Sequence, residues 1–236
     1  MPGFAERSTQ SELMDTEPVG YEEFRACLKD LSLVNTLTLA RRPTLAWLER
    51  VTRSMQAGDR LSILDVGFGY GDMLRAIHGW CLDRGFVPDL SGIDLNPWSA
   101  ASATAATPSD VKIAYHTGDV FEFRPERPVD IVVCSQFTHH LTDEQIVSFI
   151  RWMEGTAGRG WFVSDLLRHP VPFHVFRVMS RVARRHRFIQ NDGPISIARS
   201  FRRADWERLT RAAGLDPAVV EISWHVPFRI CVGRAK

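Results

Sequence analysis

The stretch LSILDVGFGYGDML, at residues 61–74, constrains the fold of this chain more than any other segment. An apolar run ends in Asp65, glycines follow at every second position, and a helical pattern then begins. Glycine lets the backbone approach a ligand closely, and the helix N-terminus offers unpaired N–H groups. A strand, a glycine turn and a helix together are typical of an α/β protein that binds an adenosine-containing cofactor. The turn glycines are Gly67, Gly69 and Gly71.

Two phosphate-binding motifs fit this loop poorly. The dinucleotide motif G-x-G-x-x-G/A has Gly or Ala where this chain has Asp72, and Gly71 comes one position early. The Walker A motif ends in Gly-Lys-Ser/Thr, which the loop lacks. Asp65 stands two residues before the first glycine, where a carboxylate is unfavourable beside a pyrophosphate and favourable beside a cation. The loop therefore favours a ligand with a positive charge.

Short apolar runs alternate with helical patterns along the rest of the chain. This alternation predicts a mostly parallel sheet with helices on both faces. The last two runs are joined by only a few residues, so they must pair antiparallel. The fold class predicted is α/β, a Rossmann-like seven-stranded sheet with an antiparallel C-terminal strand. The predicted strands are residues 61–66, 90–95, 111–116, 129–135, 160–166, 219–224 and 228–232.

The length of 236 residues fits one domain. Residues 1–19 are rich in Ser, Glu, Pro and Gly, and we expect them to be flexible. Residues 20–236 are expected to form a single domain. In that domain, the helical residues 20–56 and the insert 170–201 would cover a substrate. The insert contains an apolar stripe, Phe173, Phe176, Val178 and Met179, and a turn-like NDGP at 191–194.

Composition excludes several classes of protein. The net charge of +1 gives no reason to expect nucleic acid as a partner. No apolar run reaches the ~20 residues of a membrane span, and the polar N-terminal residues do not resemble a secretory signal. The four cysteines are far apart, which gives little support to a structural zinc site. The histidines and Asp165 could form a metal site, but no ligand spacing demands one, so no metal ligand is predicted and metal dependence stays open. We expect a reduced cytoplasmic protein.

Four motifs in order, DVGFGYG, GIDLNP, TGDVF and VVCSQFTHHL, resemble those of class I S-adenosylmethionine-dependent methyltransferases. The resemblance covers about residues 45–236. The segments DLLRHP and NDGPISIARSF are similar to small-molecule methyltransferases of the ubiquinone/menaquinone-biosynthesis type. The resemblance implies S-adenosyl-L-methionine as cofactor. This chain departs from the family at Phe68 and Tyr70, where small residues are usual.

The resemblance also implies roles for individual residues at the cofactor site. Asp65 and the glycine loop would hold the amino-acid end of the cofactor, Asp94 would hold the ribose, and Asp119 and Val120 would contact the adenine. The alternatives are a plain tight turn for the glycines, a helix N-cap for Asp94 and a turn residue for Asp119. The implied cofactor residues are Asp65, Gly67, Gly69, Gly71, Asp94, Leu95, Asp119, Val120 and Ser135.

Methyl transfer from a sulfonium requires alignment of the nucleophile, the methyl group and sulfur, and exclusion of water. If the acceptor is a hydroxyl, a base helps to remove its proton, and histidine suits neutral pH. The candidates follow the fourth and fifth strands, where ligands bind in open α/β sheets. They are His139, His140 and His169, with Asp165 and Arg168 as further anchors.

The apolar insert favours a small, largely apolar acceptor, phenolic or polyketide-like, methylated on oxygen. Methylation on carbon or nitrogen is an open alternative, as are a nicotinamide-dependent oxidoreductase and a cofactor-binding regulator without turnover. The basic residues Arg181, Arg184, Arg185 and Arg187 are expected to form a solvated helix face, with an acidic carrier protein as the alternative partner. The sequence does not determine the oligomeric state.

Overall fold

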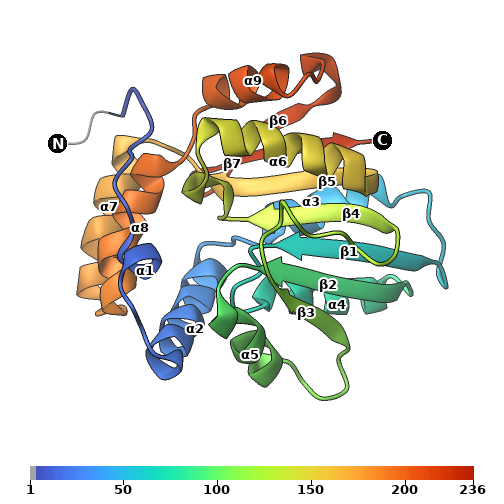
Figure 1. The fold of residues 1–236 in the computed structure, drawn as a ribbon, viewed down its shortest axis with the longest axis horizontal. Helices are drawn as coiled ribbons and strands as arrows, with labels where there is room; N and C mark the ends of the chain where they lie inside the picture. The colour runs from blue at the N-terminus through green and yellow to red at the C-terminus, as the bar shows by residue number, and fades with distance from the viewer. Residues whose placement is uncertain (1–3) are drawn as a thin grey trace.

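The computed structural model describes residues 4–236, whose strands form one seven-stranded sheet (Figure 1). The strand order is β3-β2-β1-β4-β5-β7-β6. Strands β1 to β5 pair in parallel, whereas β7 is antiparallel to both β5 and β6. The predicted fold class is confirmed. The strands are β1 (Arg60–Val66), β2 (Val87–Asp94), β3 (Ile113–Thr117), β4 (Val129–Ser135), β5 (Ala157–Leu166), β6 (Glu221–His225) and β7 (Arg229–Ala235).

Helices cover both faces of the sheet and the carboxyl ends of its central strands (Figure 1). One face carries α3 (Arg42–Val51), α4 (Asp72–Asp83) and α5 (Pro97–Ala106), and the other carries α6 (Asp143–Thr156) and α9 (Arg203–Ala212). Beyond the carboxyl ends of β1 and β4 lie α1 (Leu13–Thr16), α2 (Tyr21–Leu37), α7 (Pro170–Val182) and α8 (Arg187–Arg199). Short 3-10 turns follow β4 at Thr138–His140 and precede β6 at Pro217–Val219. None of the helices described in residues 4–236 is long and apolar enough to cross a membrane.

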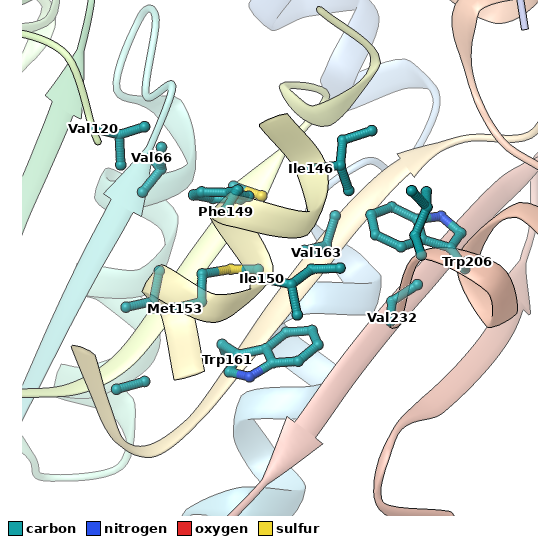
Figure 2. Close-up of a cluster of buried hydrophobic side chains, with 14 of the residues drawn as sticks. Val66, Val120, Ile146, Phe149, Ile150, Met153, Trp161, Val163, Trp206 and Val232 are labelled. Atoms are coloured by element: carbon teal, nitrogen blue, oxygen red, sulfur yellow. The ribbon is translucent and has the colours of Figure 1, made fainter. Parts of the chain in front are cut away.

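Alternation along the buried strands divides the core into two layers. In β1, Ile63 packs in the core beneath α4, and the next residue, Leu64, packs in the core beneath α6. Figure 2 shows the α6 layer, where Phe149 lies beside Val66 of β1, and Ile150 and Met153 lie nearest to Trp161 of β5. The sheet is therefore buried on both sides, which fixes the register of its central strands.

The predicted turn at residues 191–194 is wrong, because these residues lie inside α8. A Cβ on Gly193 would lie 2.0 Å from a ring carbon of Phe176, so glycine lets α7 pack closely on α8. Asp192 accepts the N–H groups of Leu13 and Met14 at 2.8 and 3.0 Å. Packing between distant segments therefore overrides the local preference of Gly and Pro for a turn.

The N-terminal segment lies along α8. Its composition predicts flexibility up to residue 19, and residues 1–3 lie outside the described residues. The Ser8 N–H donates to the carbonyl oxygen of Ala198 at 3.0 Å, and the side chain of Glu12 is buried. These contacts join residues almost 200 positions apart, so no local pattern predicts them.

Truncation of Phe149 tests the α6 layer. Phe149 is fully buried, so Phe149→Ala removes apolar contacts and leaves a cavity. We expect the free energy of unfolding to fall by about 3–5 kcal/mol, measured by urea denaturation monitored by circular dichroism. Phe149→Leu, the matched control, should lose markedly less. Equal losses for both variants would contradict this account of the packing.

Candidate active site

A cleft opens at the carboxyl ends of β1 and β4, beside the point where the chain order of the strands reverses. Helix α2 forms one wall, and the loop after β1 forms the other. The empty space between the walls, including the part open to solvent, is about 560 Å³. Asp65, Gly67, Gly69 and Ser135 line this cleft, so four of the predicted cofactor residues lie together.

The glycine loop has a backbone that other residues adopt with difficulty. The φ angles of Gly67, Gly69 and Gly71 are +71°, +51° and +72°, in the left-handed region. A Cβ on Gly67 would lie 2.8 Å from the ring of Phe137, and one on Gly71 would lie 2.6 Å from the hydroxyl of Tyr115. Glycine is therefore required both for the turn and for its close packing against neighbouring elements.

Phe68 and Tyr70 both contribute to the lining of the cleft. The Phe68 side chain is buried in the core, with its ring centroid 4.9 Å from that of Tyr115. Gly92 of β2 makes room for it, because a Cβ there would lie 2.6 Å from the Phe68 ring. The guanidinium of Arg75 lies 5.3 Å from the centroid of the Tyr70 ring. The large side chains of this loop are thus accommodated around the cleft.

The carboxyl group of Asp65 is buried at the edge of the cleft. The residue is 2% exposed, and its Oδ1 has no hydrogen-bond partner within the described part of the chain. Burial, with the nearby negative charges of Asp72 and Asp94, raises the pKa of Asp65 well above its ordinary value. Asp72 also lines the cleft. A cationic group placed here would gain charge-assisted hydrogen bonds to a carboxylate.

Asp94 joins the end of β2 to the glycine loop. Its Oδ2 accepts the Gly69 N–H at 2.9 Å, and its Oδ1 accepts the Asn96 N–H at 2.9 Å. The N-cap of α5 is Asn96, whose side chain accepts the Trp98 N–H. The alternative that Asp94 is the helix N-cap is therefore wrong. The neighbouring Leu95 is 72% exposed.

The two predicted adenine residues follow β3. The Oδ1 of Asp119 accepts the N–H of Phe121 at 2.9 Å, which is a turn contact, and the Asp119 residue is exposed. Val120 is buried in the α6 layer of the core. The side chains of this pair thus have structural contacts, and a cofactor role for Asp119 or the backbone of Val120 stays a prediction.

His139 is buried behind the end of β4, beside Asp165 of β5. Its Nδ1 lies 2.8 Å from Asp165 Oδ1, and the Thr138 hydroxyl donates to Asp165 Oδ2 at 2.6 Å. Burial alone would raise the pKa of the Asp165 carboxyl. The opposite effect is larger: His139, through its charge and its hydrogen bond, and the hydrogen bonds from Thr138 and the Leu166 N–H lower the pKa to about 2. The ionised carboxylate favours a proton on Nδ1 and leaves the lone pair of a neutral His139 on Nε2.

Two acidic residues from the N-terminal segment complete this region. The Nε2 atom of His139 lies 3.6 Å from Glu12 Oε1, and the Nε2 of His140 lies 4.0 Å from Glu12 Oε2. The Nδ1 of His140 lies 3.1 Å from Asp15 Oδ2. Burial, with a smaller contribution from Asp15, raises the pKa of Glu12 to about 7 despite the lowering effects of His140, Ser196 and Arg199. The structure thus brings His139 and His140 together around one buried carboxyl group.

His169 lies apart from this pair, exposed at the N-terminus of α7. Its Nδ1 accepts the Val171 N–H at 3.2 Å, as a helix cap. Arg168 is buried, and it binds Asp205 at 3.0 Å and the carbonyl oxygen of Ser200 at 2.7 Å. Both residues therefore have structural contacts that explain their positions.

The basic cluster of the insert is partly paired within the chain. Arg185 binds Asp30 at 2.8 Å. Arg187 binds Glu17 and Glu23 at 2.8 and 2.9 Å. These ion pairs tie the start of α8 to the N-terminal helices.

Sequence patterns missed several polar residues of this region. Glu12 and Asp15 stand in a segment with the composition of a flexible tail, and Arg199 ends α8, in which the sequence predicts a turn at residues 191–194. Arg229 starts β7 and is 2% exposed; its Nη2 donates to the Thr38 hydroxyl at 3.2 Å. Its Nε and Nη1 have no partner among residues 4–236. A buried charge is a signal for function, but burial of these residues depends on tertiary contacts.

Comparison with known proteins agrees with the fold and with the predicted motifs. Residues 63–160 match a family model described as a methyltransferase domain. None of the curated proteins compared with the chain matches it.

Solved structures share the fold at low sequence identity. The plantazolicin methyltransferase BpumL, in complex with SAH and a triazolic desmethylPZN analog, is 14% identical, with a TM-score of 0.66 over 92% of this chain and 96% of that one. Magnesium protoporphyrin IX methyltransferase from Synechocystis PCC 6803, with bound SAM, is 13% identical, with a TM-score of 0.58 over 95% and 93% of the two chains. Human N-acetylserotonin methyltransferase, in complex with SAM, is 15% identical, with a TM-score of 0.61 over 92% and 56%.

The motif resemblance is thus confirmed: residues 63–160 match the methyltransferase domain, and the sheet that contains them has the class I methyltransferase fold.

Proposed function

We propose that the protein transfers a methyl group from S-adenosylmethionine to an oxygen atom of a small, largely apolar acceptor, phenolic or polyketide-like. The observation that carries the proposal is the buried Asp65 carboxyl, with one oxygen unpartnered in the described structure, at the edge of a cleft beneath three glycines. The methionine end of this cofactor has an ammonium group, which suits a buried carboxylate. SAM or SAH is bound in solved structures of the same fold.

The proposed pose places the cofactor along the carboxyl ends of β1, β2 and β4. Asp65 and the glycine loop receive the amino-acid end, and Ser135 meets the methionine portion through its backbone. Asp94 receives the ribose hydroxyls. Its two oxygens already accept N–H groups from Gly69 and Asn96, so each would accept the further hydrogen bond on a second lone pair. Asp119 and the backbone of Val120 are proposed to contact the adenine.

The acceptor side is proposed to contain His139 and His140. Because Asp165 orients His139 through Nδ1, the Nε2 lone pair of His139 can take a proton from an acceptor hydroxyl. An electron-rich aromatic carbon needs little beyond positioning, whereas a hydroxyl acceptor needs a base. The presence of a base therefore favours oxygen over carbon as the accepting atom.

Helices α2, α7 and α8 are proposed to cover the acceptor. Phe173 is buried and Phe176 half-buried, and both pack in an apolar cluster with Ile197 and Ala198 that joins α7 to α8. Val178 and Met179 are 61% and 62% exposed and point away from the core. Of the four apolar residues predicted to form a stripe on this insert, only Phe173 and Phe176 therefore face the interior.

Substitution of Asp65 tests the cofactor site. Asp65→Asn keeps the shape of the side chain and removes its charge, so affinity for S-adenosylhomocysteine should fall by about 1.5–3 kcal/mol, roughly 10- to 100-fold. Titration calorimetry measures this change. Asp110→Asn, at an exposed position, is the matched control and should bind like the wild type. Equal affinities for Asp65→Asn and the wild type would remove Asp65 from the site.

The same variant should be more stable without ligand. The pKa of Asp65 is higher in the folded than in the unfolded protein, so stability falls as pH rises from about 3.8 through the folded pKa. Asp65→Asn lacks this loss, so its Tm at pH 7 should exceed that of the wild type. Both proteins should converge toward pH 4. Differential scanning calorimetry checks the result, and a lower Tm for the variant at pH 7 would contradict it.

Substitution of the three predicted histidines tests the acceptor side. His139→Ala should lower kcat by about 10²–10⁴-fold because it removes the proton acceptor. His169→Ala should keep the wild-type kcat, since His169 caps α7. The assay follows S-adenosylhomocysteine formation with a panel of phenols. If His139→Ala and His140→Ala both retain full kcat, O-transfer with a histidine base is wrong and C-transfer is favoured.

A further inference from the structure

Glu12, His139 and His140 form a compact cluster of groups that can bind a metal ion. One carboxylate oxygen and one nitrogen from each ring lie within 4.8 Å of one another. We propose that this cluster binds one divalent transition-metal ion of the zinc class, through Nε2 of both histidines and the carboxylate of Glu12.

The spacing of these atoms suits an ion between them. The Nε2 atoms of His139 and His140 lie 3.6 and 4.0 Å from the Glu12 oxygens, too far for hydrogen bonds. Zinc bonds to nitrogen and oxygen of about 2.0–2.2 Å put tetrahedral ligand atoms roughly 3.3–3.6 Å apart. The three ligand atoms lie within 4.8 Å of one another, so the widest spacing would shorten by at most about 1.5 Å when the ion binds.

Each histidine is held through its other ring nitrogen by a carboxylate. Asp165 Oδ1 lies 2.8 Å from Nδ1 of His139, and Asp15 Oδ2 lies 3.1 Å from Nδ1 of His140. This arrangement fixes the tautomer with the lone pair on Nε2 and raises the basicity of the imidazole as a ligand. Both rings thus present to Glu12 the nitrogen that a metal requires.

A second observation points independently to a ligand. His139 is 2% exposed, and its Nε2 has no hydrogen-bond partner among the described residues although it faces the Glu12 carboxylate. Buried polar atoms without a partner are costly in folded proteins. A bound ion would satisfy this nitrogen.

The local charge also favours a cation. Three carboxyl groups, Glu12, Asp15 and Asp165, surround the two imidazoles, and the Arg199 guanidinium lies 4.0 Å from Glu12 and 3.5 Å from Asp15. A second guanidinium, that of Arg7, donates to the His139 carbonyl oxygen at 3.3 Å, but its charge is paired with Asp143. With every acid ionised and both imidazoles neutral, three negative charges face one positive charge, a net charge of −2. A divalent ion would neutralise this charge.

The backbone of the two histidines is firmly held. Arg199 donates from Nε to the His139 carbonyl at 3.1 Å and from Nη2 to the His140 carbonyl at 3.0 Å. Arg7 donates to the Leu141 carbonyl at 2.9 Å. These bonds come from α8 and from the N-terminal segment, so the pair is fixed from two sides, as a metal site requires.

The ligand set selects the kind of ion. Two imidazoles and a carboxylate suit zinc and neighbouring first-row ions, whereas magnesium and calcium prefer oxygen ligands. Three protein ligands leave a coordination position for an oxygen atom of the acceptor. The inference thus deepens the proposed function, and the role of the ion in methyl transfer rests on that proposal.

The ion would replace direct proton transfer to His139. An acceptor hydroxyl bound to the ion would have a lowered pKa and would lose its proton to water. The oxygen then forms the new bond to the methyl carbon, while the carbon–sulfur bond breaks and its electron pair stays on sulfur. No oxidant or reductant takes part in this step.

Metal titration of the full chain tests the site without any acceptor. Protein stripped with a chelator is titrated with Zn²⁺ by calorimetry and with Co²⁺ by visible absorption. We expect one ion per chain, with Co²⁺ bands of a nitrogen-containing site. Glu12→Gln and His140→Ala should each lower the affinity by more than about 100-fold, and Asp165→Asn by about 10- to 100-fold. His174→Ala, an exposed histidine on α7, should bind like the wild type.

Titration of S-adenosylhomocysteine into the same samples separates the two proposals. Unchanged affinity in Glu12→Gln shows that the variant is folded with an intact cofactor site. Wild-type metal affinity no higher than that of Glu12→Gln would overturn the metal site. Metal binding without S-adenosylhomocysteine binding would support the metal site and contradict the proposed function.

Discussion

The buried carboxyl group of Asp65 is the constraint around which the proposed cofactor cleft is built. Strand β1 carries it into the interior, where one of its oxygens has no partner in the described structure. The loop that follows turns over it with three glycines at positive φ, and Asp94 of β2 holds this loop through the Gly69 N–H. A protein gains no stability from an unpaired buried charge, so the arrangement is explained by a ligand that supplies the missing cation.

The proposed acceptor side depends in the same way on Asp165. This residue binds His139 and Thr138, and thereby joins the end of β5 to the turn after β4. The N-terminal segment then brings Glu12 against the two histidines, and Arg199 of α8 binds their carbonyl oxygens. Elements from both ends of the chain therefore meet at one polar cluster, which gives the N-terminal residues a place in the proposed mechanism.

The sequence predicts the sheet well because its strands are apolar, short and separated by helical patterns. The strand at residues 129–135 is found with the predicted bounds, whereas the edge strand β3 is exposed, alternates weakly and begins two residues later than predicted. Local sequence patterns do not predict the secondary structure where tertiary contacts determine it. Residues 191–194 are helical because α7 packs on Gly193. The sequence does not identify Glu12 as a buried residue, because it stands in a polar segment and is buried only by packing against α8 and the histidine pair.

Calorimetric titration of the intact protein with S-adenosylhomocysteine and, separately, with NAD and NADP tests the central claim most directly. The loop geometry and the buried acid at the end of β1 predict that S-adenosylhomocysteine binds at one site per chain. They also predict no measurable heat from either dinucleotide, whose pyrophosphate would lie beside Asp65. Binding of a dinucleotide, with no binding of S-adenosylhomocysteine, would contradict the account.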